Sequence, residues 1–295
     1  MKDYNDIFKD YLLNVKKSSK NTVESYIRDL TQFSSYCAQN NINDLKEVSA
    51  PKLKSYLEYL TAIGKSEATK SRIKASLRCF YKVLESKDIT SGNPVSDVKV
   101  KKIERKLPGI LDANEIVLLL SQPNLTDYKG IRDKAMLELL YATGIKVSEL
   151  ISLKISDVNL QIGIIHLHND KKERIVPIYP AAVKSIADYL VNIRPAIVLD
   201  ESEERLFTNM NGQALSRQGF WKIIKYYSDK AGIKKDITPH TLRHSFAAHL
   251  LENGAKLTDI KDMLGHTDIS STQIYAQLMK SKYTSSYAKF HPLAK

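Results

Sequence analysis

The 295-residue sequence has few cysteines, no long uncharged apolar run and no excess of acidic residues. Its two cysteines, Cys37 and Cys79, are too few and too far apart for a disulfide framework, a zinc site or a thiol redox motif. No stretch approaches the roughly 18 apolar residues of a membrane span, and the first residues lack the apolar core of a signal peptide. These absences favour a cytoplasmic protein in a reducing compartment.

Motifs of several common enzyme classes are also missing. The chain has no Walker A phosphate-binding loop, no G-x-G-x-x-G, no G-x-S-x-G and no H-E-x-x-H. Nucleotide hydrolysis, dinucleotide binding and zinc hydrolysis therefore have no support in the sequence. The seven histidines form no convincing set of metal ligands, so neither a metal nor an organic cofactor is expected.

Positive charge, by contrast, is abundant. The sequence holds 45 lysines and arginines against 33 aspartates and glutamates, which gives a formal net charge of +12. Such an excess favours a polyanionic partner, and nucleic acid is the leading candidate. With 43% hydrophobic residues, the chain is long and apolar enough for two domains, each with its own core.

Residues 1–98 predict a first domain made of short helices. Between residues 22 and 37, apolar side chains recur at the spacing of one buried helical face. A second helix is predicted to begin near Pro51 and to end at Gly64, because proline suits the first turn of a helix and glycine suits its end. The third helix is predicted over 66–85.

The helix predicted over 66–85 also carries a row of basic residues. They recur at every fourth position, as Lys70, Lys74, Arg78 and Lys82. Side chains spaced in this way lie on one face of a helix, so the row could follow the phosphate backbone of DNA. A solvated helix face explains the row equally well, because lysine-rich exposed faces are common.

A basic segment between turn residues predicts a linker at 99–109. Within it, Lys101 and Lys102 are candidate DNA contacts. A cationic join is useful if the two domains close around a rod of negative charge, and the sequence therefore predicts a two-domain clamp.

Residues 110–295 predict a mainly helical second domain. A helix-start pattern lies at 112–115, where an acidic residue stands three positions after the first capping residue. A helix over 133–142 is expected to end at Gly144. Two short β-prone runs, at 164–168 and 174–178, predict a β-hairpin.

Four residues in the last fifth of the chain form an ordered set. His240 and Arg243 are three apart, so on a helix they project from one face and could hold one oxyanion together. His266 and Tyr275 follow at distances that a loop and the next helix could fold back onto that face. Each residue taken singly has an ordinary explanation, as a structural histidine, a surface ion pair or a packed aromatic ring.

The pattern His240-x-x-Arg243, Leu-Gly-His266 and Tyr275 resembles the tyrosine recombinase, or phage integrase, family. Residues 142–150 resemble the first box of its Xer branch, and the resemblance covers essentially the whole chain. It implies a helical core-binding domain followed by a catalytic domain. It also implies a site-specific DNA recombinase that forms a 3′-phosphotyrosyl intermediate and a free 5′-hydroxyl, without ATP or metal.

The resemblance implies a role for each matched residue. Tyr275 is the nucleophile, and Arg243 neutralises charge on the non-bridging phosphate oxygens. His266 bonds the same phosphate, His240 assists proton transfer at the tyrosine, and Glu149 orients neighbouring side chains. These roles suit the chemistry, because a phenol with a pKa of about 10 needs a proton acceptor. Fixed cations also lower the barrier to phosphoryl transfer.

The sequence departs from the family at two positions. Lys146 stands where the family has an arginine, and it lacks the planar fork that holds two phosphate oxygens; such a loss can cost about 10³ to 10⁵ in rate. Asn169 stands at the position of the general-acid lysine, whose loss is worth about 10² to 10⁴. Lys171 lies two residues on, hence on the same face of an extended strand, and could replace it. Lys172 matches the family's second, non-catalytic lysine.

Two functions from different classes remain open. The first is a recombinase with altered or slowed chemistry, rescued by Lys171 or by a partner protomer. The second is an architectural or regulatory DNA-binding protein on a recombinase scaffold. The retained set of His240, Arg243, His266 and Tyr275 favours the first.

The resemblance also implies an assembly. It predicts four protomers on two DNA sites, either of one kind or together with a second recombinase. The tail from about residue 277 to residue 295 could dock on a neighbouring protomer, and packing on its own domain is an equally good interpretation.

Overall fold

The computed structural model describes residues 4–96, 98, 108–168, 173–278 and 280. The chain forms two compact units, Met1–Arg105 and Lys106–Lys295, and the division falls within the segment predicted to be a linker. Both units are built mainly from helices, and the second adds a three-stranded antiparallel sheet, which confirms the predicted fold class. Within the described residues, no helix has the length and apolar character needed to cross a membrane.

The first unit contains the three helices that the sequence predicts. In chain order its elements are α1 (Asn5–Asp10), the π-helical turn η1 (Tyr11–Val15), α2 (Lys20–Gln39), the 3-10 turn η2 (Leu45–Glu47), α3 (Ala50–Ala62) and α4 (Glu67–Glu85). The side chains of Ser19 and Ser66 accept hydrogen bonds from backbone N–H groups of the first turns of α2 and α4. These caps fix where both helices begin, because they satisfy donors that have no partner inside the helix.

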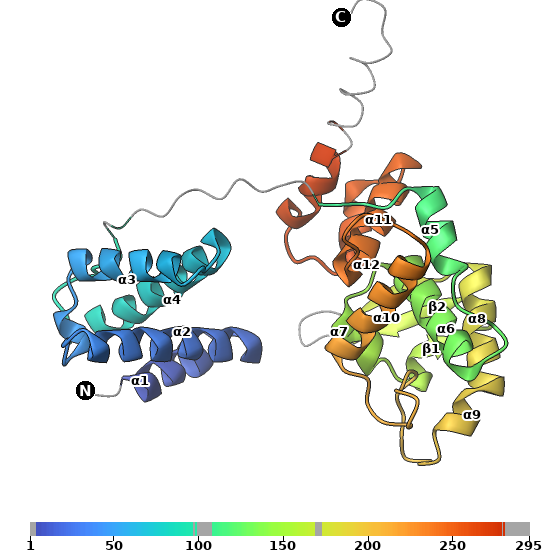
Figure 1. Cartoon of the computed structure of the whole chain (residues 1–295), viewed down its shortest axis with the longest axis horizontal. Coiled ribbons are helices and arrows are strands. Elements are labelled where there is room, and N and C mark those ends of the chain that lie inside the picture. Colours follow the sequence, from blue (N-terminus) through green and yellow to red (C-terminus); the bar gives the residue numbers. More distant parts are fainter. Residues whose placement is uncertain (1–3, 97, 99–107, 169–172, 279, 281–295) are drawn as a thin grey trace, which may run out of the picture. The chain divides into compact units, whose positions relative to one another are not determined.

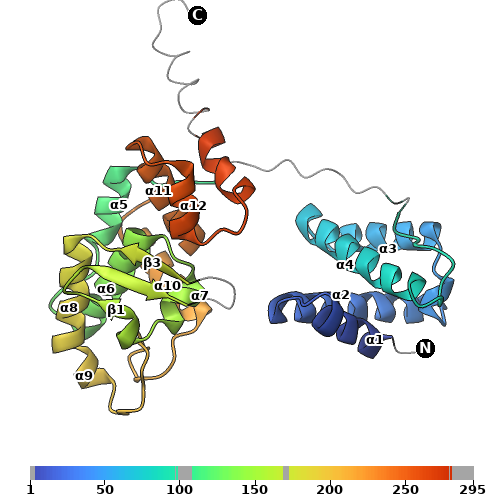
Figure 2. The same cartoon turned by 180° about the vertical axis from the view of Figure 1, so that it is seen from behind.

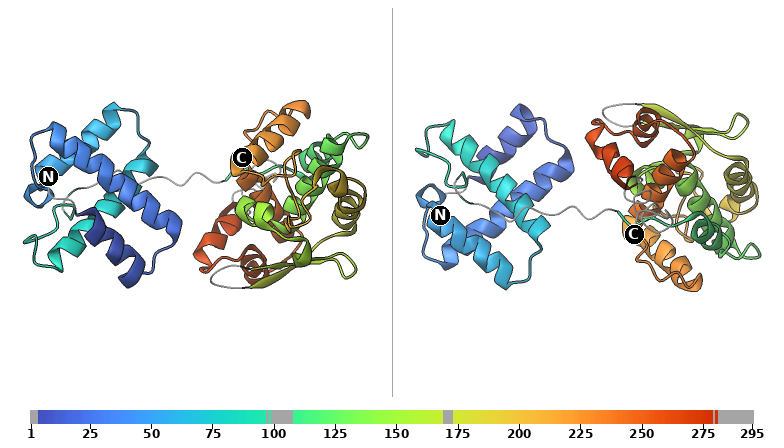
Figure 3. Two further views of the ribbon diagram at one scale, coloured as in Figure 1. Left: turned by 90° about the horizontal axis from the view of Figure 1, so that it is seen from below. Right: turned by 90° about the horizontal axis from the view of Figure 1, so that it is seen from above.

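The apolar stripe of α4 forms the centre of the first core. Ile73, Leu77, Phe80 and Leu84 are all completely buried. The helix packs against α2 (Figures 1 and 3), and the ring of Phe80 lies 5.5 Å from that of Phe8 in α1. Burying a side chain of this size contributes about 1.5–3 kcal/mol to the stability of the fold. The stripe therefore stabilises the packing of the helices in one bundle.

The second unit combines nine helices or helical turns named here with the small sheet. In chain order they are α5 (Ala113–Leu120), α6 (Tyr128–Thr143), α7 (Val147–Ser152), the 3-10 turn η3 (Ile155–Asp157), β1 (Val158–Asn159), β2 (Ile164–Leu167), β3 (Arg174–Pro177), α8 (Pro180–Asn192), α9 (Arg194–Ile197), α10 (Arg217–Lys230), α11 (Pro239–Glu252) and α12 (Leu257–Leu264). Residues 270–278 are also helical. The capping box predicted at the start of α5 is present, with Asp112 and Glu115 bonding each other's backbone N–H groups.

The sheet has the order β1-β2-β3 and is antiparallel throughout. β2 and β3 are the predicted hairpin, and their register pairs Leu167 with Arg174. β1 was not predicted, because two residues are too short to show the alternation by which a strand is recognised in a sequence. β3 packs against α6 and α12, which places the hairpin beside the helices that carry the candidate site (Figure 2).

Gly144 ends α6 in a left-handed conformation, with φ of 57°. A Cβ atom at this position would lie 2.3 Å from a ring carbon of Phe246 in α11. Only glycine therefore allows α6 to stop here and α11 to pack so closely. The turn brings the Gly144 carbonyl group to the residues described next.

Candidate active site

Arg243 lies at the centre of the candidate site and is buried, with 5% of its surface exposed. It is carried by α11, which begins after the capping residue Thr238. Its Nη1 donates to the Gly144 carbonyl at 2.6 Å, and its Nη2 donates to the Leu264 carbonyl at 2.8 Å. Carbonyl oxygens fix the plane of the guanidinium but carry no net charge, so its positive charge can still attract an anion.

His266 contacts Arg243 directly. Its Nε2 lies 3.0 Å from Nη2 of Arg243, and its Nδ1 lies 3.0 Å from the hydroxyl of the buried Thr272. Burial, followed by the charges of Arg243 and Lys146, lowers the pKa of His266 to about 4. The imidazole is therefore neutral near pH 7, and its Nε2 accepts from the guanidinium while its Nδ1–H donates to Thr272.

Tyr275 is almost completely buried, with 1% of its surface exposed. It belongs to the helical residues 270–278, and its ring packs among Phe246, Ile260 and Leu264. Burial raises the pKa of the phenol, whereas the nearby charge of Arg243 lowers it. The phenol is therefore protonated at neutral pH and needs a proton acceptor before it can act as a nucleophile.

The histidine that contacts the tyrosine is His244, and the role expected for His240 stays a prediction. The hydroxyl of Tyr275 lies 2.9 Å from Nδ1 of His244, whereas His240 is exposed in the first turn of α11. The ring centroids of His240 and His244 are 6.5 Å apart, one helical turn from each other. His244 was missed because the sequence gives it no special spacing, although it follows Arg243 directly.

Lys146 and Glu149 form the start of α7. Lys146 is exposed, and its backbone N–H donates to Oε2 of Glu149 at 2.8 Å. The positive charge of Lys146 is among the causes of the lowered pKa of His266, so the lysine acts on the same site electrostatically. Glu149 is buried.

Arg174 is a buried member of the site that sequence reasoning missed. It opens β3, and its two terminal nitrogens donate to the two carboxylate oxygens of Glu149 at 3.0 and 2.9 Å. Its Nε donates to the Met263 carbonyl at 2.8 Å, one residue before the Leu264 carbonyl that Arg243 binds. The only signal in the sequence is an arginine that opens an apolar strand.

Gly265 connects α12 to His266 and lies against Arg174. It has φ of 66°, and a Cβ atom here would lie 2.8 Å from Nη1 of Arg174. The Leu-Gly-His sequence therefore has a physical reason: glycine allows the left-handed turn and leaves room for the guanidinium. His266 can then fold back toward Arg243.

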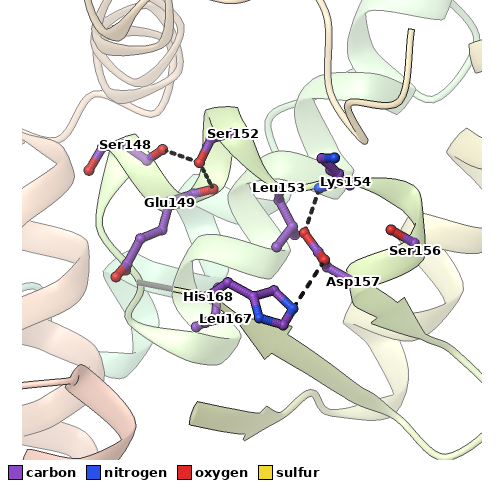
Figure 4. A pocket seen from close by; sticks show the side chains of 9 residues that line it. All are labelled: Ser148, Glu149, Ser152, Leu153, Lys154, Ser156, Asp157, Leu167 and His168. Carbon is purple, nitrogen blue, oxygen red and sulfur yellow. Dashed lines mark hydrogen bonds and ion pairs between the residues drawn. The ribbon is translucent and has the colours of Figure 1, made fainter. Parts of the chain in front are cut away.

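The hairpin tip with Asn169, Lys171 and Lys172 lies outside the described residues, so the general-acid position stays a prediction. At the end of β2, Nδ1 of His168 lies 3.2 Å from Oε1 of Glu173, and its Nε2 lies 3.6 Å from Oδ1 of Asp157. His168 also borders a pocket of about 530 Å³, with Glu149 among its lining residues. Figure 4 shows the imidazole turned toward Asp157 across this pocket.

The basic row of α4 differs from the expectation at one position. Lys70 is buried, and its ammonium group bonds the Thr61 hydroxyl and pairs with Glu67. It therefore does not present its charge to solvent as Arg78 and Lys82 do, and the DNA contact at Lys70 stays a prediction. Arg78 and Lys82 are exposed.

The three remaining members of the predicted DNA-binding set are Lys74, Lys101 and Lys102. Lys74 is half-buried, and burial together with the charge of Arg78 lowers its pKa. Lys101 and Lys102 fall outside the described residues. For these positions the DNA contact stays a prediction.

Two family models match the chain. Residues 110–282 match the phage integrase family, and residues 6–88 match the phage integrase N-terminal SAM-like domain. The tyrosine recombinase XerD of Staphylococcus epidermidis is 41% identical over 294 residues, which span 98% of this chain and 100% of that protein. XerD of Halalkalibacterium halodurans is 42% identical over 278 residues, which span 94% of this chain and 93% of that protein.

Solved structures show the same architecture. The XerA recombinase is 28% identical, with a TM-score of 0.55 and coverage of 98% of both chains. The XerH site-specific recombinase, in its post-cleavage complex with a palindromic difH substrate, has a TM-score of 0.77 at 21% identity. That match covers 96% of this chain and 84% of XerH, and it shows a shared fold.

Proposed function

This chain belongs to the phage integrase family of tyrosine recombinases, and we propose that it is a site-specific DNA recombinase with Tyr275 as its nucleophile. The observation that carries the proposal is the meeting of three segments in one buried site. Arg243 from α11 binds His266 from the turn after α12, and the next residue of α11, His244, bonds the hydroxyl of Tyr275.

The chemistry follows from these positions. The Tyr275 oxygen attacks the phosphorus of a DNA phosphodiester, the bond from phosphorus to the 5′ oxygen breaks, and a 3′-phosphotyrosyl bond forms. The energy of the broken ester is kept in the new one, so rejoining needs no ATP. Arg243 binds the non-bridging oxygens, where negative charge grows in the transition state. His266 joins it when the phosphate replaces the Arg243 contact at Nε2 and the imidazole carries its proton there, with Nδ1 then accepting from the Thr272 hydroxyl.

The burial of Arg243 and Tyr275 favours a catalytic role over a purely architectural one. A guanidinium and a phenol are both costly to bury unless they are paired, and the folded chain keeps both in contact with histidines. A protein that only held DNA would gain as much from exposed lysines. An architectural role stays the alternative, and it predicts DNA binding without cleavage.

We further propose that the chemistry is slower than an arginine-containing site would allow. Lys146 supplies a positive charge near His266, but an ammonium group cannot hold two phosphate oxygens in one plane. Asn169 cannot donate a proton usefully, so the proton for the departing 5′ oxygen is assigned to Lys171. In this proposal four protomers assemble on two DNA sites, and a neighbouring protomer completes the active site.

Covalent trapping tests the proposal. The protein is incubated with a nicked suicide DNA duplex, and a denaturing gel is examined for a protein–DNA adduct. We expect an adduct that Tyr275→Phe abolishes and Tyr141→Phe retains, because Tyr141 is the other tyrosine that bonds a histidine of α11. A clear band shift on native gels without any adduct would favour the architectural alternative.

A further inference from the structure

Proton removal from Tyr275 needs an acceptor at the phenolic oxygen, and the structure offers one. The Tyr275 hydroxyl lies 2.9 Å from Nδ1 of His244, and the two ring centroids are 5.6 Å apart. His244 is half-buried, one turn inside α11 from the exposed His240. A general base must lie within about 2.6–3.2 Å of the proton it removes, and this distance meets that requirement.

We propose that His244 is a catalytic residue whose Nδ1 takes the phenolic proton as the Tyr275 oxygen attacks phosphorus. The inference rests on the proposed function, because it assumes that Tyr275 is the nucleophile. In this step the bond from the Tyr275 oxygen to phosphorus forms, and the bond from phosphorus to the 5′ oxygen breaks. The phenolic proton passes to Nδ1, and the departing 5′ oxygen takes its proton from water. When the strand is rejoined, His244 returns the proton to the phenol.

Burial and the charges around His244 favour its neutral form, which can accept a proton. His240 and Arg243 face it from its own helix, and Tyr275 and His266 face it from the segments packed against α11. Burial, then the charges of His240 and Arg243, lowers the pKa of His244 to about 4. The imidazole is therefore neutral at neutral pH, and in its Nε2–H tautomer Nδ1 is free of hydrogen and can accept a proton.

Bound DNA makes the imidazole a stronger base at the moment of reaction. A phosphate held by Arg243 brings negative charge close to His244 and offsets the positive charge of the guanidinium. An imidazolium ion next to this phosphate is stabilised, so the pKa of His244 rises toward the operating pH when substrate binds. Proton acceptance is thus coupled to the presence of the phosphodiester.

The chain contains a matched pair that serves as a control. His249 follows His244 on α11, and its Nδ1 lies 2.9 Å from the hydroxyl of Tyr141. Both pairs have the same distance of 2.9 Å between Nδ1 and the hydroxyl. The second pair contacts neither Arg243 nor His266 among the bonds described. If loss of any histidine–tyrosine hydrogen bond slowed the reaction, substitution of His244 and substitution of His249 should therefore have the same effect.

The test measures the rate of adduct formation on the suicide duplex for His244→Asn, His244→Gln and the control His249→Gln. Asparagine can place an oxygen near the position of Nδ1, so it can keep the hydrogen bond but cannot take up the proton. Thermal unfolding and DNA band shifts establish that each variant is folded. A second arm places 3,5-difluorotyrosine at position 275, because a more acidic phenol depends less on a base.

We expect both His244 variants to slow adduct formation by about 10² to 10⁴ and His249→Gln to leave it within about twofold of the unaltered protein. Difluorotyrosine should recover roughly tenfold or more in the His244→Asn background and far less with His244 present. Adduct formation by His244→Asn at the unaltered rate would overturn the inference alone. A slow variant without recovery by difluorotyrosine would reduce His244 to a positioning residue and overturn it too. Failure of the unaltered protein to form any adduct would instead contradict the proposed function.

Discussion

Arg174 of β3 and Glu149 of α7 form a bidentate ion pair in the interior of the second unit, with N–O distances of 3.0 and 2.9 Å. The side chains keep only 6% and 8% of their surfaces exposed. The same guanidinium binds the Met263 carbonyl at the end of α12. The pair therefore joins α7, the hairpin and the turn that positions His266.

Removing one partner of this pair should be costly. In Arg174→Met the buried carboxylate of Glu149 loses its bidentate partner, so we expect a loss of about 3–5 kcal/mol in unfolding free energy. Urea unfolding measures the loss. Adding Glu149→Gln to the same chain should restore part of it, because the buried charge is gone; a double variant that is less stable than Arg174→Met would contradict this account.

Gly265→Ala should lower both stability and adduct formation. The left-handed backbone disfavours alanine, and the added Cβ would lie 2.8 Å from Nη1 of Arg174. Gly232→Ala is the matched control, since Gly232 has the same φ of 66° but open space around its Cβ position. We expect Gly232→Ala to cost about 1 kcal/mol and to leave cleavage intact. Equal effects of the two substitutions on cleavage would remove Arg174 from the explanation.

Lys146→Arg should speed cleavage. An arginine here adds the planar fork that a lysine lacks, and a phosphate-clamping arginine is worth about 10³ to 10⁵ in phosphoryl transfer. We expect at least roughly a tenfold gain in the rate of adduct formation, since the lysine already supplies the charge. If the rate stays flat while Tyr275 remains essential, Lys146 does not occupy the clamping position.

Acid should destabilise the second unit through its buried histidines. Burial lowers the pKa of His244 and of His266 from 6.5 to about 4. Between these values the unfolded chain binds protons that the folded chain does not, so stability is full above pH 6.5 and falls as the pH drops toward 4. We expect each histidine to contribute on the order of 2 kcal/mol to this fall.

Urea unfolding at pH 7 and pH 4.5 measures that change. The variant His266→Asn has no such group to titrate at that position, so its unfolding free energy should depend less on pH. A pH dependence identical to that of the unaltered protein would show that His266 does not supply it.

Salt dependence of DNA binding should separate the members of the basic row on α4. Arg78 and Lys82 are exposed, so Arg78→Gln or Lys82→Gln should each reduce the slope of log Kd against log salt concentration by about one. Lys70→Gln should leave the slope unchanged, because Lys70 is buried against Thr61 and Glu67. A reduced slope for Lys70→Gln would show that the lysine leaves its internal partners to reach phosphate.

Local signals in the sequence predicted most of the helical architecture. The periodic stripe of α4, with Phe80 at its centre, and the capping residue Asp112 both act through neighbours a few positions away, so their effects are visible without the fold. The pairing of Arg243 with His266 could be anticipated only through resemblance, because 23 positions separate the two residues.

Contacts between distant segments could not be predicted in the same way. Arg174 meets Glu149 across 25 positions, and His244 meets Tyr275 across 31. Nothing in the local pattern distinguishes His244 from His240, since both lie on one side of the same helix. Lys70 is buried because Thr61 of α3 comes within 2.7 Å, a contact that a helix considered alone does not reveal.

The most direct test of the central claim is to identify the residue that becomes bonded to DNA. The trapped adduct is digested with protease and nuclease, and the nucleotide-bearing peptide is sequenced by mass spectrometry. Because the chain has 16 tyrosines, the position of the modification decides the matter. We predict a phosphodiester on the oxygen of Tyr275; a nucleotide on any other residue, or DNA that is bound but never bonded, would contradict the account.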